Sequence, residues 1–431
     1  MNFIEELRWR GMLHNITPEL EKIVETQQVT AYLGIDPTAS SLTVGNLAAL
    51  MMLMHLQRAG HRPVVLVGGA TGMVGDPSGK KSERSLLDEA TLQKNIAGGK
   101  AQLQKLLDFD NETNPAIMVN NYDWFKEINV LEFLRDIGKH LTVNYMMAKD
   151  SVKSRIETGI SFTEFSYQLI QGYDFVHLYK TYGCNVQMGG SDQWGNITAG
   201  TELVRRMLGG EAYAVTCPLI TKADGTKFGK SESGNIWLSP ELTTPYQFYQ
   251  FWLNTSDADA GKFIRIFTFL SQPEIEALEA EHVEAPHLRK LQKRLAQEVT
   301  TMLHGAENCA VAVDASQILF NKKTTSENLK LIFGALSHSD ILGIFDGVPQ
   351  FEITRTDLEQ GINIIDFLAE KTNIYRSKGE VRRALKGNAV LINKDRVKQQ
   401  ERTISPNDLI SDKFILVQKG KKSFNLVVVS A

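Results

Sequence analysis

Two glycine-rich loops of this 431-residue chain carry lysines at a density that suits the binding of phosphate. One spans residues 69–84 and reads GATGMVGDPSGKKSER, and the other spans residues 222–234 and reads KADGTKFGKSESG. Backbone amides and ammonium groups are common partners of phosphate oxygens. Neither loop fits the GxxxxGK[ST] motif, because Val74 and Asp224 stand where its first glycine belongs. A phosphate at these loops must therefore be held in another way.

A predicted helix with a polar start is a further candidate for phosphate binding. It begins in residues 40–50, SSLTVGNLAAL, where Gly45 lies in the first turn and a long apolar run follows. Free amides and the positive end of the helix dipole attract an anion there, and a glycine lets a flat base approach the backbone. An ordinary capped core helix has the same appearance. This segment alone leaves both interpretations open.

A second predicted helix carries a polar stripe. In SYQLIQGYDF, residues 166–175, the side chains of Tyr167, Gln171 and Asp174 fall at positions i, i+4 and i+7. Such spacing puts them on one helix face, and a tyrosine, an amide and an acid are unusual company for a core. The stripe indicates either a ligand-binding face or an exposed one.

The elements that position these groups read as an α/β fold. Short β-type runs alternate with amphipathic stretches in the first half, which predicts a doubly wound, Rossmann-like parallel sheet. The runs are residues 29–35, 62–69, 116–122, 185–190 and 213–220. Ligands of such sheets bind beyond the carboxyl ends of the strands. Three of the runs pass directly into polar or glycine-rich loops, so we expect the site there.

The chain is too long for one core, and its patterns divide it into several parts. We predict a catalytic domain over residues 1–245, with a helical insertion at about 123–184. An all-helical domain over 246–325 follows, in which Ser271 to Glu274 form a capping box. Residues 326–360 are expected to be a linker, and 361–431 a small α+β RNA-binding domain.

The composition of the chain indicates the cellular location of the protein and the kinds of partner that it binds. The chain has no long apolar run, and its first residues lack an apolar signal core, so we expect a cytoplasmic protein without a membrane partner. Cys184, Cys217 and Cys309 are widely spaced and read as packing residues, and the histidines show no metal-ligand spacing, so no metal site is expected. Residues 376–422 hold 13 Lys or Arg against 5 Asp or Glu. That excess, with Lys419 to Lys422 at a predicted hairpin tip, suits structured RNA.

Together these motifs resemble the class I aminoacyl-tRNA synthetases. That family carries a HIGH-type motif at its first helix and a KMSKS-type motif after its last strand, which here read Thr43-Val44-Gly45-Asn46 and Lys227-Phe228-Gly229-Lys230-Ser231. Further segments are similar to the bacterial tyrosine-specific branch: YLGIDPTASSL, LVGGATGMVGDPSGKKSER, NNYDW, FLRDIGKH, GISFTEFSY, GGSDQWGNI and TKADGTKFGKS. The resemblance covers essentially the whole chain.

The resemblance implies a two-step reaction. L-Tyrosine and ATP, the latter with Mg²⁺, would give tyrosyl-adenylate and pyrophosphate, and tyrosine would then pass to the terminal ribose of its tRNA. The tyrosine carboxylate is already a nucleophile, so the first step needs positioning and positive charge instead of a general base. The resemblance also implies a homodimer formed through the insertion, with Phe162 in the contact region.

The resemblance further implies roles for individual residues. Those that position or neutralise the reacting groups are Thr38, Thr43, Lys80, Arg84, Gln193, Lys227, Lys230 and Ser231. Those that bind ATP are Gly34, Asp36, Gly45, Asn46, Gly190, Asp192 and again Lys230. Those that bind tyrosine are Tyr32, Asp76, Asn121, Tyr167, Gln171, Asp174 and Gln187. Within that pocket, Asp174 and Tyr32 would receive the phenolic hydroxyl.

Two alternatives remain at this stage. A tryptophan-specific relative would share the fold, although Asp174 facing Tyr32 suits a phenol better. A synthetase-derived RNA-binding protein without catalysis is favoured by one feature, Thr43 at the position of the usual motif histidine. Tyrosine-dependent ATP–pyrophosphate exchange separates all three readings.

Overall fold

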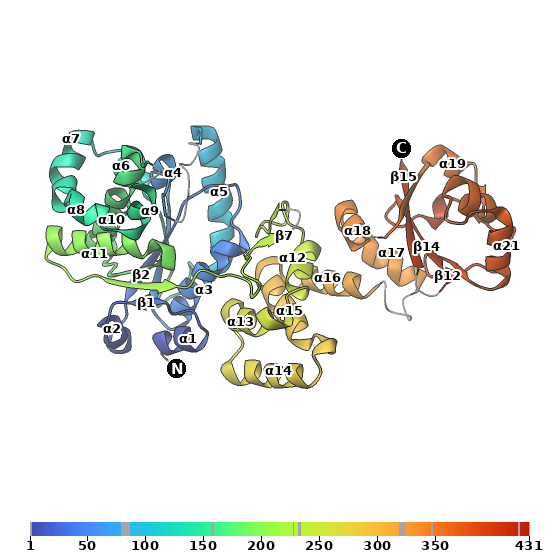
Figure 1. The fold of residues 1–431 in the computed structure, drawn as a ribbon, viewed down its shortest axis with the longest axis horizontal. Helices are drawn as coiled ribbons and strands as arrows, with labels where there is room; N and C mark the ends of the chain where they lie inside the picture. The colour runs from blue at the N-terminus through green and yellow to red at the C-terminus, as the bar shows by residue number, and fades with distance from the viewer. Residues whose placement is uncertain are drawn as a thin grey trace. The chain divides into compact units, whose positions relative to one another are not determined.

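The structure is a computed structural model in which the chain forms two compact units. It describes residues 2–78, 87–156, 159–226, 228–231, 234–318, 325–345, 348–420 and 423–430. The first unit comprises Met1–Thr243 and Phe251–Leu303, and the second comprises Thr244–Gln250 and His304–Ala431 (Figure 1). The domain boundaries predicted near residues 245, 325 and 360 stay predictions.

A six-stranded sheet in the order β1-β6-β5-β2-β3-β4 forms the centre of the first unit (Figure 1). Its strands are β1 (Asn15–Ile16), β2 (Thr30–Ile35), β3 (Arg62–Val67), β4 (Ile117–Asn120), β5 (Val186–Gly190) and β6 (Tyr213–Cys217). Strands β2 to β6 run parallel and confirm the five predicted runs. Strand β1 pairs antiparallel with β6 and was not predicted, because two residues carry no periodicity.

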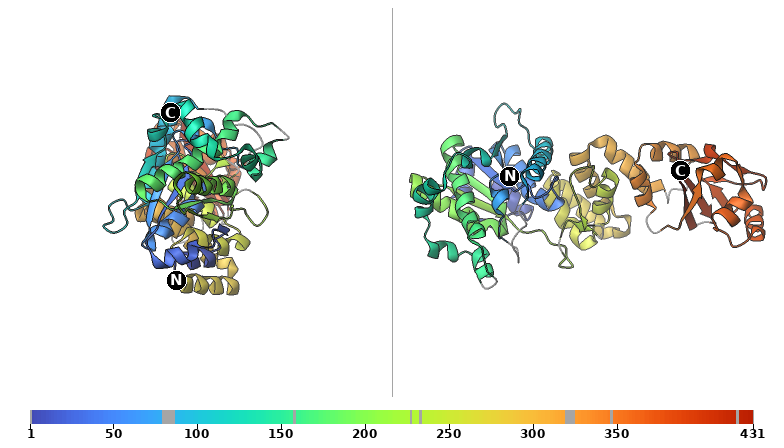
Figure 2. Two further views of the ribbon diagram at one scale, coloured as in Figure 1. Left: turned by 90° about the vertical axis from the view of Figure 1, so that its left-hand side faces the viewer. Right: turned by 90° about the horizontal axis from the view of Figure 1, so that it is seen from above.

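Helices cover both faces of this sheet (Figure 2). They include α1 (Phe3–Trp9), α2 (Leu20–Thr26), α3 (Val44–Arg58), α4 (Thr71–Val74), α5 (Glu89–Leu106) and α11 (Trp194–Leu208). Helix α3 packs on β2 and β3 and is buried along most of its length. Tyr32, Val64 and Leu66 join a core cluster with side chains of α10 and α11. Because side chains alternate along a strand, the intervening positions face the other way, toward α3.

The insertion is helical, as predicted. It contains α6 (Tyr122–Phe125), α7 (Val130–Glu132), η1 (Phe133–Ile137), η2 (Gly138–His140), α8 (Val143–Met147), α9 (Asp150–Ile156) and α10 (Phe162–Tyr182). Helix α10 begins at Ser161, whose side chain accepts from the Glu164 amide, and ends at the left-handed Gly183. Its buried face presents Tyr167 and Asp174, which confirms the predicted helical spacing.

The segments after β6 lead from the sheet into a group of helices. They are η3 (Ser191–Gln193, before α11), β7 (Lys230–Ser231), β8 (Gly234–Asn235), α12 (Pro245–Leu253), α13 (Asp257–Phe267), α14 (Gln272–Glu284), η4 (Pro286–Leu288) and α15 (Lys290–His304). Ser271 and Glu274 form the predicted capping box, and Gly305 follows α15 with φ +86°. The helical character of this stretch is therefore confirmed.

The second unit contains a five-stranded sheet in the order β12-β11-β14-β15-β9. Its strands are β9 (Gln350–Thr354), β11 (Val390–Ile392), β12 (Asp395–Arg396), β14 (Phe414–Lys419) and β15 (Ser423–Ser430), and β10 (Ile362–Asn363) pairs with β13 (Thr403–Ile404). Its helices are α16 (Ala306–Ile318), α17 (Ser326–Gly334), α18 (His338–Ile344), α19 (Arg355–Glu359), α20 (Ile364–Asp366), η5 (Phe367–Lys371), α21 (Lys378–Lys386) and η6 (Pro406–Asp408).

One expectation for this unit needs correction. Residues 326–360 were expected to be a linker, yet they form α17, α18, β9 and α19, and β9 pairs in parallel with β15. The partner of β9 lies more than 70 residues further along the chain, so local patterning carries no trace of the pairing. The predicted hairpin at Gly420 is confirmed by the pairing of β14 with β15, whereas Lys421 and Lys422 lie outside the described residues.

Two expectations from composition concern the cysteines, which were predicted to be packing residues, and membrane-spanning segments, which were not expected. Cys184, Cys217 and Cys309 are all buried, as expected of packing residues. Burial raises the pKa of the Cys217 thiol to about 12, so this group is neutral at physiological pH. In the part of the chain that the structure describes, no helix combines the length and the apolar character needed to cross a membrane.

Candidate active site

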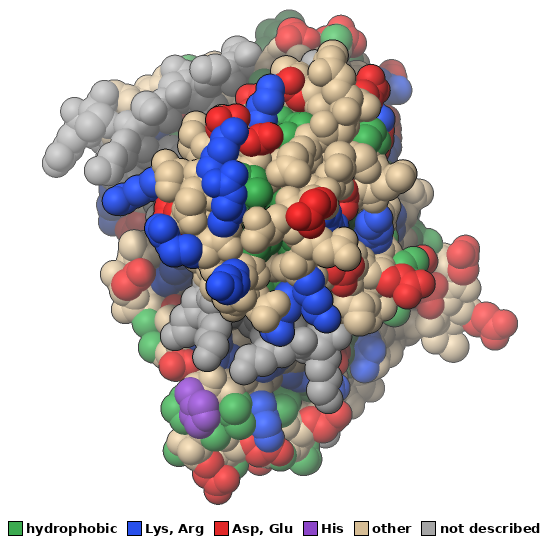
Figure 3. All heavy atoms as spheres, turned by 90° about the vertical axis from the view of Figure 1, so that its right-hand side faces the viewer, with side chains coloured by type: hydrophobic (Ala, Val, Ile, Leu, Met, Phe, Trp, Pro, Cys, Tyr) green, Lys and Arg blue, Asp and Glu red, His purple; other side chains and the backbone are tan. Residues whose placement is uncertain are grey.

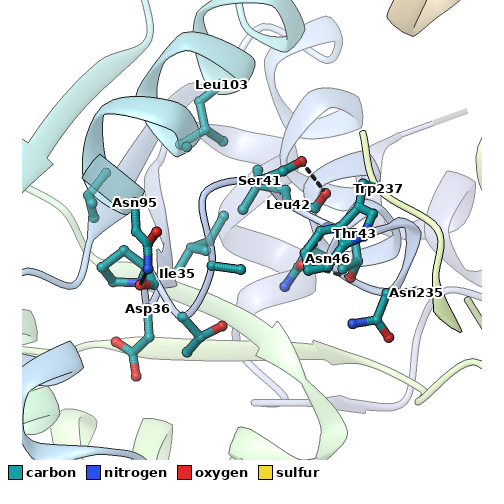
Figure 4. A pocket seen from close by; sticks show the side chains of 15 residues that line it. Ile35, Asp36, Ser41, Leu42, Thr43, Asn46, Asn95, Leu103, Asn235 and Trp237 are labelled. Carbon is teal, nitrogen blue, oxygen red and sulfur yellow. Dashed lines mark hydrogen bonds between the residues drawn. The ribbon is translucent and has the colours of Figure 1, made fainter. Parts of the chain in front are cut away.

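The loop after β2, the carboxyl end of β3, helix α5, the start of α3 and the segment at Asn235 and Trp237 line a cavity of about 310 Å³. Thr43, Asn46, Asn235 and Trp237 lie together at one end of it, and Asp36 lies toward the other (Figure 4). The structure thus brings the predicted helix start next to the segment that follows the lysine loop. Asn235 and Trp237 were not among the predicted site residues.

Backbone contacts hold the lysine loop against the start of α3. The Val44 amide donates to the Ile236 carbonyl at 3.1 Å, and the Ile236 amide donates to the Gly229 carbonyl at 3.0 Å. Gly229 has φ +83°, and a Cβ there would approach Val44 Cγ2 to 2.9 Å. Both its conformation and this close approach require glycine. The two sequence motifs therefore touch.

Phe228 fixes the loop on its other side. Its buried ring packs 4.8–5.8 Å from four aromatic rings, those of Phe251, Trp252, Phe263 and Phe267. Lys80, Arg84 and Lys227 lie outside the described residues, and for Lys230 and Ser231 the structure describes the backbone alone. The structure thus shows how the lysine loop is anchored, and the roles of its lysines stay predictions.

Thr43 caps α3 through its neighbour Asn46. Its backbone amide and its hydroxyl both donate to Asn46 Oδ1 at 3.0 Å. The hydroxyl proton, expected to serve a phosphate, is thus engaged within the protein. A Cβ on Gly45 would lie 3.3 Å from Thr43 Oγ1, so a side chain there would crowd the Thr43 hydroxyl.

Asp174 is a buried carboxylate held by two donors. Asn121 Nδ2 donates to one oxygen at 3.1 Å, and Trp124 Nε1 donates to the other at 3.0 Å. Burial raises the pKa of Asp174 well above its ordinary value, while these two hydrogen bonds act to lower it. Trp124 was missed as a site residue. Its signal was its position in NNYDW, three residues after Asn121.

Tyr32 lies near the Asp174 carboxylate but makes no hydrogen bond to it. Its hydroxyl is fully buried and has no hydrogen-bond partner among the described residues. Burial, and then the charge of Asp174, raise the pKa of Tyr32 well above its ordinary value. An unpaired buried hydroxyl costs about 1–3 kcal/mol, which a ligand with a matching polar group would recover.

Asp36 links this pocket to the far end of the cavity. It accepts from Thr71 Oγ1 at 2.6 Å and from the Tyr167 hydroxyl at 3.0 Å, and Asn121 Nδ2 donates to Thr71 Oγ1 at 3.1 Å. Burial and the charge of Asp36 raise the pKa of Tyr167. Hydrogen bonds therefore run without a break from Asp36 to Asp174. Asp36 was expected to bind ATP and Tyr167 to bind tyrosine, and the structure joins the two side chains by a hydrogen bond.

Asp76 is the centre of a second network. It accepts from Gln193 Nε2 at 2.7 Å, from the Ser78 amide at 3.0 Å and from Asn196 Nδ2 at 3.3 Å. Asp76 and Gln193, predicted for separate tasks, are thus directly bonded, and Asn196 was missed.

The remaining predicted residues lie in α10, in β2 and β5, or in the segments that follow these two strands. Gln171 Oε1 and Gln187 Oε1 are buried acceptors without a partner in the described structure. A Cβ on Gly190 would come within 2.7 Å of Asp192 Oδ1, so a side chain there would displace the Asp192 carboxylate. Gly34 is exposed in β2, one strand away from Gly190.

Comparisons with known proteins cover both units. Residues 24–321 match the family model "tRNA synthetases class I (W and Y)", and residues 340–427 match the "Tyrosine--tRNA ligase SYY-like C-terminal domain". The tyrosine–tRNA ligase of Porphyromonas gingivalis is 59% identical over 434 residues, covering 100% of both chains. That of Bacteroides fragilis is 58% identical, over 99% of this chain and 100% of its own.

Solved structures of aminoacyl-tRNA synthetases are also similar to this chain. A truncated mitochondrial tyrosyl-tRNA synthetase of Aspergillus nidulans aligns with a TM-score of 0.68 and 31% identity, over 74% of this chain and 94% of that one. The tryptophanyl-tRNA synthetase of Plasmodium falciparum aligns with a TM-score of 0.52 over 79% of this chain and 88% of that one. At 14% identity, the latter similarity concerns the fold alone.

Proposed function

The chain belongs to the class I tRNA synthetases for tryptophan and tyrosine and is a tyrosine–tRNA ligase, and from this premise we propose how its residues share the reaction. ATP and tyrosine are its substrates. Identity of 59% over the full length to a tyrosine–tRNA ligase decides against the tryptophan-specific and the non-catalytic alternatives. The observation that carries the proposal is the hydrogen-bonded network from Asp36 to Asp174.

Asp174 and Tyr32 receive the phenolic hydroxyl of tyrosine. A carboxylate has about four lone-pair sites, so Asp174 can accept a third hydrogen bond beside those from Asn121 and Trp124. Phenylalanine would leave the buried Tyr32 hydroxyl without a partner, which costs about 1–3 kcal/mol. The pocket therefore selects for a phenol.

The ammonium group of tyrosine binds at the other end of the pocket, between Asp76, Tyr167 and Gln171. The unpaired Gln171 Oε1 suits a cationic donor. Gln187 supports this pocket from β5, where its position pairs with Tyr32. Gln193, already bonded to Asp76, orients the reacting carboxylate.

ATP, taken up with Mg²⁺ as substrate, lies over the start of α3. Gly45 and Asn46 face the nucleoside, with Gly34 below it, while Gly190 and Asp192 accommodate the ribose. Asp36, which lines the cavity, contacts ATP and also accepts a hydrogen bond from Tyr167. Thr38 lies toward the phosphates, and Thr43, whose amide and hydroxyl donate to Asn46 Oδ1, shapes the helix start beside them. The charge that stabilises the departing pyrophosphate comes from Lys80, Arg84, Lys227 and Lys230, with Ser231 beside them.

The protein forms a homodimer through its insertion. Six large apolar side chains there are exposed: Val130, Leu131, Leu134, Val143, Met147 and Phe162. Such a concentration of apolar surface is unusual for a monomer. Light scattering of the full chain should give the mass of two copies, and Leu131→Glu should give that of one.

The second unit binds tRNA in the cytoplasm. A face of this unit carries several lysine and arginine side chains (Figure 3). Arg382, Arg383 and Lys386 of α21 are exposed and lack an ion-pair partner among the described residues. Exposed cations of this kind contact backbone phosphates more than base edges.

Steady-state kinetics of tyrosine-dependent ATP–pyrophosphate exchange tests this division of labour. Gln171→Ala should raise KM for tyrosine, whereas Lys230→Ala should lower kcat with little change in that KM. The assignment fails if the two variants show the same pattern.

A further inference from the structure

Asn235 occupies a position between the two sequence motifs. In the β7–β8 pair it stands across from Lys230, and Trp237, two residues later, forms a bridge with Thr43. Asn235 directly precedes Ile236, whose carbonyl accepts from the Val44 amide at 3.1 Å in the first turn of α3. Asn235 lines the same cavity as Thr43 and lies beside it (Figure 4).

The Asn235 side chain is free to bind a ligand. The residue is exposed, and its carboxamide has no hydrogen-bond partner among the described residues. A carboxamide offers two N–H donors in a neutral group. In an antiparallel strand, residues two apart face the same side, so Asn235 and Trp237 share the face that Trp237 presents to the cavity.

Thr43 and Val44 at the start of α3 have no free hydrogen-bond donor for a phosphate, and Asn235 would supply one. The Thr43 hydroxyl and the Thr43 amide both donate to Asn46 Oδ1, so neither proton is available to a phosphate in this arrangement. The Val44 amide is also engaged, because it donates to the Ile236 carbonyl. A phosphate oxygen at this end of the cavity therefore needs a donor from the neighbouring segment.

We infer that the Asn235 carboxamide donates a hydrogen bond to the polyphosphate of ATP beside Thr43 and keeps it as pyrophosphate leaves. This inference rests on the proposed function, in which the phosphates of ATP occupy this cavity. A carboxylate oxygen of tyrosine attacks the α-phosphorus, the bond to the bridging oxygen breaks, and pyrophosphate departs with the electron pair. Asn235 forms no covalent bond and stabilises charge on a non-bridging oxygen.

Single-turnover formation of tyrosyl-adenylate tests this role at saturating tyrosine and ATP. Asn235→Ala should slow the step about three- to ten-fold, the effect of losing one neutral hydrogen bond. Asn235→Asp should slow it more, because the new charge repels phosphate. Asn235→Gln keeps the amide and should retain more activity than Asn235→Ala. KM for tyrosine should stay constant in all three.

Two controls separate the possible failures. Asn144→Ala removes an exposed asparagine of α8 that does not line the cavity and should match the parent protein. Lys230→Ala reports on the proposed phosphate site itself. If Lys230→Ala is slow and Asn235→Ala is not, the inference about Asn235 is wrong and the phosphate site stands. If neither is slow, the proposed phosphate site is wrong as well.

Discussion

Replacing Trp124 by phenylalanine removes one donor to Asp174 and little else. The indole Nε1 donates to Asp174 Oδ1 at 3.0 Å, and the ring stacks on His177 with centroids 4.2 Å apart. Phenylalanine retains an aromatic ring for the stack and lacks the N–H. The change therefore isolates the contribution of the hydrogen bond to tyrosine binding.

The expected magnitude follows from the charge and burial of the acceptor. Asp174 is 1% exposed, and a hydrogen bond to a buried charged group contributes about 1.5–3 kcal/mol. We therefore expect Trp124→Phe to lower kcat/KM for tyrosine about ten- to a hundred-fold. Donation from Trp124 lowers the pKa of Asp174, so its loss raises that pKa further. The carboxylate form exists above the pKa, and hence the acid limb of the pH profile should move to higher pH.

The assay is tyrosine-dependent ATP–pyrophosphate exchange as a function of pH, with phenylalanine as competitor. Trp9→Phe, at a half-buried position of α1, is the matched control, and thermal unfolding of both variants shows whether the fold is retained. Unchanged kcat/KM and an unmoved acid limb in folded Trp124→Phe would refute the assignment of Trp124 as a support of Asp174.

Three further predictions concern other parts of the chain. Asp174→Asn should abolish tyrosine activation or its selectivity over phenylalanine, since an amide is a weaker acceptor for the phenol than a carboxylate, and exchange kinetics with both amino acids measures this. Thr43→Ala removes the hydroxyl that donates to Asn46 at the start of α3, and the altered helix start should slow adenylate formation by roughly 1–2 kcal/mol. Lys230→Ala removes a charged donor to the leaving group and should slow the step by about 3 kcal/mol. A single-turnover rate for Thr43→Ala equal to that of the parent would show that this contact has no part in positioning the phosphates. A chain ending at residue 325 should form adenylate at nearly the normal rate and charge tRNA poorly, and a normal charging rate would contradict the role of the second unit. A chain ending at residue 355 should be less soluble, because its strand β9 loses the partner β15.

The fold was predictable where local patterns are strong. The five parallel strands are apolar runs bounded by polar loops, and α10 and α14 begin at recognisable caps, Ser161 and Ser271. Strand β1 was not predicted because it has two residues, and β9 was not predicted because it is mostly exposed and is defined by its distant partner β15. Pairing at long range leaves no period in the sequence.

The site was predictable as a set of residues but not as a set of contacts. Residue types and a family resemblance located Asp174 and Tyr167, whereas the bonds from Trp124 to Asp174 and from Tyr167 to Asp36 depend on side-chain directions that only the folded chain defines. Asn235 escaped for the same reason, since its place beside Thr43 arises from the bridge between Trp237 and Thr43. Sequence spacing does not encode such cross-chain register.

The most direct measurement of the central claim is ATP–pyrophosphate exchange by the full chain with tyrosine and with phenylalanine as the only amino acid. The account predicts rapid exchange with tyrosine, and kcat/KM for phenylalanine lower by at least about a hundred-fold. Phenylalanine leaves the buried Tyr32 hydroxyl without any partner and the Asp174 carboxylate without a third one. Comparable exchange with the two amino acids would contradict the claim that Asp174 and Tyr32 read the phenol.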